Sequence, residues 1–164
     1  MSEESVPFLF SEATKKKLRD LPSFKKELEE GRSVQELLGF SDETMEQLCK
    51  AAYHLFEEKK YQESANAFLF LTTLNLHHCE YWLGLGMAMQ FCQEYETAID
   101  AYELAAISDV ASPLPYFYLG KCLFAIHDRS AALQALDLAI EMAGEEEPFA
   151  EIKQQAELAR SFLT

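Results

Sequence analysis

The sequence predicts an all-α fold, a solenoid of three helix-turn-helix repeats with an N-terminal helical arm and a C-terminal capping helix. Apolar residues recur at helical spacing through residues 41–144. This apolar pattern returns three times with a period of 34 residues and without an insertion. Small and large side chains occupy the same places in each copy, as in the matched sets Ala52, Gly86 and Gly120, then Ser64, Ala98 and Ala132, then Phe68, Tyr102 and Leu136. A 34-residue period with this order is the signature of the tetratricopeptide repeat.

The repeat register divides the chain into three parts. Residues 1–40 are expected to form an N-terminal flexible segment and a helical arm, and residues 147–164 a C-terminal capping helix. Residues 41–144 hold the repeats, at about 45–78, 79–112 and 113–146. Within each repeat, the small residues are expected where the first helix meets the second, because a larger side chain there would push the two helices apart.

The helix ends carry recognisable signals. Ser33 followed by Glu36 predicts a capping box before a short helix, and Ser41 predicts the N-cap of the first repeat. The pair Lys59 and Lys60 is expected to form the turn between the two helices of that repeat. Pro148 is expected to start the last helix, whose apolar face comprises Ile152, Ala156, Ala159 and Leu163.

Composition and charge exclude several classes of protein. The 164 residues carry a formal net charge of −14, of which residues 41–164 contribute −13, with seven Lys and Arg against twenty Asp and Glu. An acidic repeat domain repels phosphate backbones and anionic lipid headgroups, so neither nucleic acid nor a membrane is an expected partner. The acidity is also explained by a solvated surface that keeps the protein soluble. The start of the chain lacks the pattern of a secretory signal, so a cytoplasmic location is expected.

No catalytic, cofactor or metal site is predicted, and the protein is not expected to be an enzyme. The Gly84-Leu85-Gly86 run lacks a preceding strand and a third glycine, so it is not a phosphate-binding loop. His77-His78-Cys79 lacks a second ligand cluster at zinc spacing. The four cysteines form no CxxC pair and are expected to be reduced thiols.

The first helices of the repeats are expected to line a concave groove, because stacked helix pairs curve with these helices inside. The residues about a third of a turn from the small positions are Cys49, Tyr53, Phe56, Leu83, Met87, Gln90, Phe117, Lys121 and Phe124. Six of these nine are large aromatic or aliphatic residues, which favours a peptide ligand held by its apolar side chains. The alternative is that the helices are rotated and these residues belong to the core.

The N-terminal arm carries a narrow apolar stripe that it cannot bury alone. The stripe comprises Leu18, Leu21, Phe24 and Leu28. It is expected to pack on the repeats or on another chain.

Residues from about Val34 to Ala159 resemble the class II chaperones of type III secretion, the LcrH/SycD-like chaperones of translocator proteins. The resemblance is carried by SDETMEQLCKAAYHLFEEKKYQESANAF, by LxxLxxHxxxYWLGLGMAMQ, by YETAIDAYELAAISDVASPLPYF and by FAEIK. It implies a bacterial, cytosolic chaperone without ATPase activity that binds hydrophobic translocators through an extended PxLxxP-like segment. It also implies a homodimer formed through the N-terminal helices, where the stripe from Leu18 to Leu28 lies.

Carried over by position, the resemblance places Tyr61 and Leu74 in the peptide groove together with Cys49, Tyr53, Phe56, Leu83 and Met87. The family commonly has an aromatic residue where Cys49 stands, which changes the shape expected for that part of the groove. Repeat three departs in another way, with Arg129 where the earlier copies have Tyr61 and Tyr95.

The alternative function is a tetratricopeptide scaffold or adaptor that binds another protein partner. Repeat domains of that kind that capture a terminal carboxylate present a basic clamp on the first helices. Here only Lys50 and Lys121 lie there, which argues against carboxylate capture.

Overall fold

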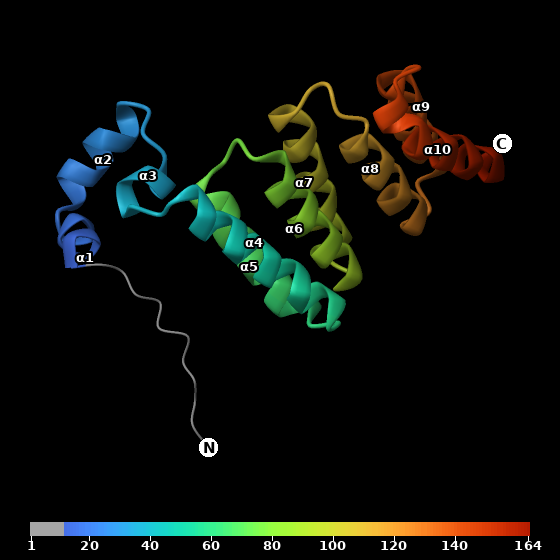
Figure 1. The fold of residues 1–164 in the computed structure, drawn as a ribbon. Helices are drawn as coiled ribbons and strands as arrows, with labels where there is room; N and C mark the ends of the chain where they lie inside the picture. Colours follow the sequence, from blue (N-terminus) through green and yellow to red (C-terminus); the bar gives the residue numbers. More distant parts are fainter. Residues whose placement is uncertain (1–11) are drawn as a thin grey trace.

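The computed structural model describes residues 12–164 and confirms the predicted all-α class (Figure 1). Within those residues the chain forms helices and no strand. The segment 1–11, which was expected to be flexible, lies outside the described residues, and so do the side chains of Thr14, Lys15, Lys17 and Leu18. No helix in the described part is long and apolar enough to cross a membrane.

Three helical hairpins stack in chain order, as the repeat register predicts (Figure 1). The first pairs α4 (Asp42–Glu57) with α5 (Tyr61–Leu74), the second α6 (Cys79–Phe91) with α7 (Tyr95–Ser108), and the third α8 (Leu114–Ala125) with α9 (Arg129–Ala143). The second helix of each hairpin packs against the first helix of the next, α5 on α6 and α7 on α8. This stacking is how a repeat protein shares one core among units too small to bury one alone.

The three hairpin turns are the same structure repeated. Lys59, Gln93 and His127 lie 34 residues apart and have left-handed backbone conformations, with φ of 63°, 64° and 65°. The next residue in each turn donates its N–H back to the preceding helix, as Lys60 does to the Leu55 carbonyl at 2.9 Å. This is the Schellman arrangement, which satisfies the last carbonyls of a helix. The turn therefore repeats with the period of the sequence.

The small residues lie where the hairpin helices approach each other, as predicted. A Cβ atom added to Gly86 would lie 2.5 Å from the ring of Tyr102 on α7, and one added to Gly120 would lie 2.9 Å from Leu136 on α9. Ser64, at the reciprocal position on α5, is buried and donates its hydroxyl to the Ala52 carbonyl at 2.8 Å. The second and third hairpins are thus closed by a glycine against a larger side chain, and the first by the contact of Ser64 with Ala52.

Gly84 lies at a contact between two hairpins and not at a contact within one. A Cβ atom there would lie 2.3 Å from the ring of Phe68, which belongs to α5 of the preceding hairpin. The two glycines of the Gly84-Leu85-Gly86 run thus let α6 approach its neighbours on two sides. Close packing of α6 therefore explains why this run contains two glycines although it is not a phosphate-binding loop.

The N-terminal arm consists of α1 (Glu12–Arg19), α2 (Leu21–Glu29) and α3 (Val34–Leu38), which lie to one side of the hairpins in Figure 1. The Ser33 hydroxyl accepts the Glu36 N–H at 3.1 Å, and the Ser41 hydroxyl accepts the Thr44 N–H at 3.1 Å, so both predicted N-caps form. Leu37 and Leu38 of α3 are buried, which attaches the arm to the first hairpin.

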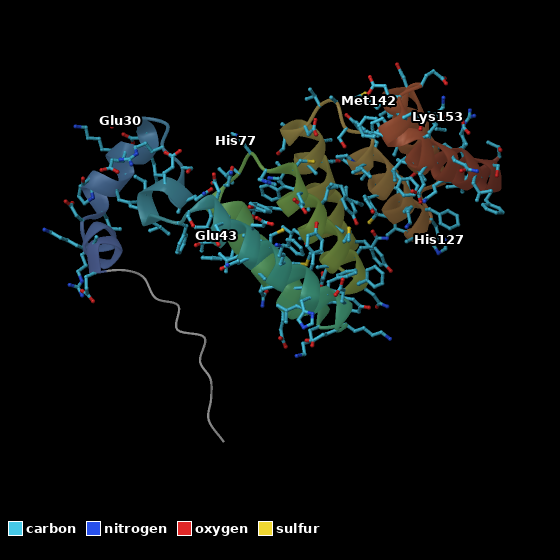
Figure 2. All side chains as sticks on the ribbon, in the orientation of Figure 1. Glu30, Glu43, His77, His127, Met142 and Lys153 are labelled. Atoms are coloured by element: carbon cyan, nitrogen blue, oxygen red, sulfur yellow. The ribbon has the colours of Figure 1, made fainter. Side chains whose placement is uncertain are left out.

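The C-terminal helix α10 (Ala150–Leu163) packs on α9 and closes the open end of the solenoid. A short 3-10 turn (Glu147–Phe149) containing Pro148 precedes it. Of the predicted apolar face, Ala156 and Leu163 are buried, while Ile152 and Ala159 are partly buried in the same cluster. Arg160 pairs with Asp137 of α9 at 2.6 Å, and Lys153 pairs with Glu145 at 2.8 Å (Lys153 is labelled in Figure 2). The capping helix is thus held by both apolar and charged contacts.

Candidate peptide-binding groove

A pocket of about 720 Å³ lies along the first helices of all three repeats. We call it the central groove. Its apolar residues are Tyr53 of α4, Leu83 and Met87 of α6, and Leu114 and Tyr118 of α8. Its polar residues come from the loops before α6 and α8 and from the adjoining ends of α6 and α7, namely His77, His78, Cys79, Glu80, Ser108, Asp109 and Ser112. Figure 2 labels His77 in the first of these loops. An apolar cavity with a polar margin is the usual form of a ligand site.

A second pocket, of about 440 Å³, adjoins the central groove at its N-terminal side. We call it the acidic pocket. It lies between α3, α4 and α6 and shares Tyr53, His78 and Glu80 with the central groove. Cys49 lines the acidic pocket and is buried. Four of the predicted groove residues line these adjoining pockets: Cys49 lines the acidic pocket, Leu83 and Met87 line the central groove, and Tyr53 lines both.

Tyr53 stands at the boundary between the two pockets and is held in place by two contacts. Its hydroxyl donates a hydrogen bond to Glu80 Oε1 at 3.2 Å, and its ring packs edge-on to Phe68 with centroids 5.0 Å apart. Burial, and then the Glu80 carboxylate, raise the pKa of this hydroxyl above its ordinary value. Tyr53 therefore remains a neutral donor at physiological pH and presents a fixed aromatic wall to the groove.

The cysteines and histidines near the groove form no nucleophilic pair. Burial raises the pKa of the Cys49 thiol to about 11, with further contributions from Glu80 and Glu46, so the thiol stays protonated. His54, which is near Cys49 in sequence, instead lies 3.2 Å from the Glu58 carboxylate. His78 stacks on the Tyr81 ring with centroids 4.0 Å apart. In the part of the chain that the structure describes, no three potential metal ligands come together.

Phe56 and Tyr61 lie together at the tip of the first hairpin rather than in the central groove. Their ring centroids are 5.2 Å apart, and both rings also contact Phe91 at the end of α6, at 5.1 and 4.9 Å. Phe91 is 56% exposed and was missed by the sequence analysis, because it lies one residue beyond the predicted stripe of α6. We call these three residues the tip cluster.

Three predicted groove residues face other parts of the molecule. Gln90 accepts a hydrogen bond from the Tyr102 hydroxyl at 2.8 Å, so it is turned toward its own partner helix α7. Leu74 is 1% exposed and lies in the core of the first hairpin. Phe117 is 5% exposed and packs in the C-terminal core. The structure does not bring these residues into the central groove.

Lys121 and Phe124 line a separate apolar pocket of about 410 Å³ between α8 and α10. The other residues of that pocket include Leu136, Ala159, Phe162 and Leu163. The Lys121 ammonium lies 5.4 Å from the centroid of the Phe117 ring, within the range of a cation–π contact. The groove expected along all three repeats is therefore divided into two separate pockets at α8.

Leu114, Tyr118 and Glu80 line the central groove although the sequence did not predict them there. Tyr118 stands 34 residues after Gly84 and stacks on Tyr102 with centroids 6.0 Å apart. An aromatic residue that replaces a glycine in the next repeat is the signal that could have identified it. Glu80 carries no such signal, since an exposed acid in the first turn of a helix is common.

The predicted dimer stripe is partly exposed in the chain described here. Leu21 is 65% exposed and Leu28 is 37% exposed, while Phe24 is half-buried against the core cluster that includes Leu38 of α3. The side chain of Leu18, the fourth residue of the stripe, lies outside the described residues. The stripe thus retains apolar surface after the arm has folded.

These observations define the class of protein: a helical-repeat domain with an apolar groove on the first helices of its hairpins, which is a peptide-binding architecture. No family model matches the chain. The chain is 30% identical over 125 residues to the low calcium response locus protein H of Yersinia pestis, which covers 76% of this chain and 74% of the relative. The chain belongs to the family of type III secretion translocator chaperones that includes this protein and SycD.

Solved structures agree with this assignment. The translocator chaperone SycD of Yersinia enterocolitica superposes with a TM-score of 0.78 at 26% identity, covering 80% of this chain and 98% of SycD. SycD in complex with a peptide of the translocator YopD superposes with a TM-score of 0.70 at 27% identity, covering 75% of this chain and 94% of that one. SycD also occurs in an alternative dimer, with a TM-score of 0.72 at 28% identity, covering 75% and 93% of the respective chains.

Proposed function

We propose that this chain is a cytosolic, ATP-independent chaperone of type III secretion that binds hydrophobic translocator proteins and keeps them soluble and competent for secretion. The observation that carries the proposal is the central groove, where Tyr53, Leu83, Met87 and Tyr118 from three successive repeats line one apolar hollow. Membership of the translocator chaperone family supports it, as does the binding of a translocator peptide by SycD.

The client is an extended segment with a PxLxxP-like sequence, and the central groove takes its apolar side chains. The groove residues lie on helices that are held by the hairpin cores, so they are ordered before the client arrives. The client segment alone loses conformational freedom on docking, which limits the affinity. No step of this mechanism needs a nucleophile or a cofactor, because the chaperone acts by covering apolar surface.

The tip cluster is the natural extension of this site. Phe91 is exposed, and the half-buried rings of Phe56 and Tyr61 pack beside it at the ends of the first two hairpins. A client segment that is longer than the central groove would continue over these rings along α4. This extension accounts for the placement of Phe56 and Tyr61 among the peptide-binding residues.

We also propose that the protein forms a homodimer through the stripe of Leu18, Leu21, Phe24 and Leu28. Support comes from the exposure of Leu21 and Leu28 and from the existence of a dimer of SycD. Burying exposed leucines between two arms removes apolar surface from water, which favours association.

The test is co-expression with the apolar proteins encoded next to this gene, followed by purification and mapping of the bound segment with overlapping peptides. A stable complex in which one short segment suffices for binding is expected. Titration of that segment into the double variant Tyr53→Ala, Phe56→Ala should show loss of binding with an unchanged helical circular dichroism spectrum. The control is Leu69→Ala, which removes an exposed leucine from the second helix of the hairpin. Undiminished affinity of the double variant would show that the site is elsewhere.

A further inference from the structure

The acidic pocket has an apolar floor and a charged margin. Met45, Cys49 and Tyr81 form the floor and are all buried. Three carboxylates stand around it, those of Asp42, Glu46 and Glu80. The central groove, by comparison, has two carboxylates in its lining, Glu80 and Asp109, and Glu80 is common to both cavities.

The charges of this pocket are only partly compensated. Lys50 lies 2.9 Å from Glu46 and neutralises it. Asp42 accepts a hydrogen bond from the Gln35 amide at 2.9 Å, and Glu80 accepts one from the Tyr53 hydroxyl at 3.2 Å, but both donors are neutral. Within residues 12–164 neither Asp42 nor Glu80 forms an ion pair. Three carboxylates against one ammonium therefore leave the pocket negatively charged.

The position of the pocket relates it to the central groove. Tyr53, His78 and Glu80 form a wall common to both cavities. A segment whose apolar side chains occupy the central groove therefore has its next residues beside the acidic pocket. The pKa of Cys49, raised first by burial and then by Glu80 and Glu46, reflects the same negative field at the pocket floor.

We propose that the acidic pocket holds a lysine or arginine side chain of the client segment, adjacent to the apolar residues that fill the central groove. Such a side chain has an aliphatic stem, which suits the floor of Met45 and Tyr81, and a cationic end, which reaches Glu80 and Asp42. The inference rests on the proposed function, because the central groove must hold the client. It adds a rule of selectivity, in which clients carry a basic residue beside the apolar motif.

Synthetic peptides that share one PxLxxP core and carry Lys, Gln or Glu on either side of it provide the test. The expected order of affinity is Lys, then Gln, then Glu, with about a five- to tenfold difference between the Lys and Glu peptides at low salt. The difference should shrink as salt is added, since ions screen partly exposed charges.

Two variants assign the effect to the pocket. Glu80→Gln and Asp42→Asn remove the charges but keep an oxygen that accepts the hydrogen bonds of Tyr53 and Gln35. In the double variant the three peptides should bind within about twofold of one another. Glu57→Gln with Glu63→Gln, two exposed positions on α4 and α5, removes the same number of charges; this matched control should preserve the order.

Each outcome decides one question. Binding of all three peptides to the wild-type protein with equal affinity would overturn the basic-residue pocket and leave the proposed function standing. A second result to look for is a control variant that reduces the differences in affinity among the three peptides as much as the double variant does. That result would show that the peptides are distinguished by the total charge of the protein and not by this pocket. Failure of every peptide to bind would overturn the proposed function, and this inference with it.

Discussion

At the scale of single residues, contacts between a glycine and a larger side chain close the second and third hairpins. Gly86 lies under the ring of Tyr102, and Gly120 lies under Leu136. Tyr102 is fully buried and its hydroxyl is bonded to Gln90, so its ring has no free space to move into. Leu136 is also buried, but its aliphatic side chain can change rotamer. The two glycines are therefore expected to tolerate substitution to different degrees.

Gly86→Ala should lower the free energy of unfolding by about 1–3 kcal/mol through overpacking, despite the higher helix propensity of alanine. Gly120→Ala is the matched comparison and should cost less, because its neighbour is flexible. Urea unfolding followed by circular dichroism measures both. Equal stability of Gly86→Ala and the wild type would contradict the close contact with Tyr102.

His78 offers the opposite case, a residue whose replacement should stabilise the fold. Its Nδ1 atom is buried and has no hydrogen-bond partner in the described part of the chain. His78→Phe keeps the aromatic stack on Tyr81 and removes the unpaired nitrogen. A gain of about 1 kcal/mol, seen as a rise in Tm of roughly 2–4 °C, is expected for a chain of this size. His77→Phe, at the exposed neighbouring position, should leave Tm unchanged, and a similar rise there would point to general hydrophobicity instead.

At the scale of elements, the capping helix α10 depends on a residue that departs from the repeat. Arg129 stands where the first two repeats have Tyr61 and Tyr95, and it donates to the carbonyl of Leu163 from Nε at 2.7 Å and also from its terminal nitrogen. A cation at the C-terminal end of a helix is favourable because it meets unsatisfied carbonyls and the negative end of the helix dipole. Arg129, which departs from the repeat pattern, thus stabilises the helix at the C-terminal end of the solenoid.

Arg129→Gln should therefore loosen the last turn of α10 while the hairpins stay folded. Amide hydrogen exchange should become faster at residues 160–164 and remain unchanged in α4 to α7. Arg19→Gln, which removes the same charge from the exposed arm, is the control. Unchanged protection of the last turn in Arg129→Gln would show that apolar packing alone holds the helix.

At the scale of the whole molecule, apolar surface remains at both ends of the solenoid. Leu21 and Leu28 are exposed on the arm, and Leu158 and Phe162 are 59% and 79% exposed on the capping helix. The formal charge of −14 keeps copies apart at long range, so association requires a specific apolar contact. The arm is the contact proposed here for the homodimer.

The double variant Leu21→Ser, Leu28→Ser should shift the protein from dimer to monomer in light scattering after size-exclusion chromatography. The physical reason is the loss of apolar surface that the two arms would bury. Leu158→Ser with Phe162→Ser is the matched control at the other end and should remain a dimer. A monomer produced by the control instead of the arm variant would place the interface on the capping helix.

The sequence by itself determined the repeat register, because the 34-residue period reflects contacts made within and between neighbouring hairpins. The small positions at Gly86, Gly120 and Ser64 and the turns at Lys59, Gln93 and His127 all follow that period. These contacts depend on helical spacing, so they can be predicted from the sequence alone. The family resemblance added the kind of client.

Only the tertiary structure decided which side chains meet in the groove. A helix rotated by a fraction of a turn exchanges groove and core, and spacing alone does not measure that rotation. Tyr53, Leu83 and Met87 line the central groove and Cys49 lines the adjoining acidic pocket, whereas Gln90 is turned to Tyr102, Leu74 lies in the core, and Lys121 and Phe124 face α10. Glu80 and Tyr118 joined the groove because the packing of neighbouring hairpins, which no single repeat encodes, sets its final shape.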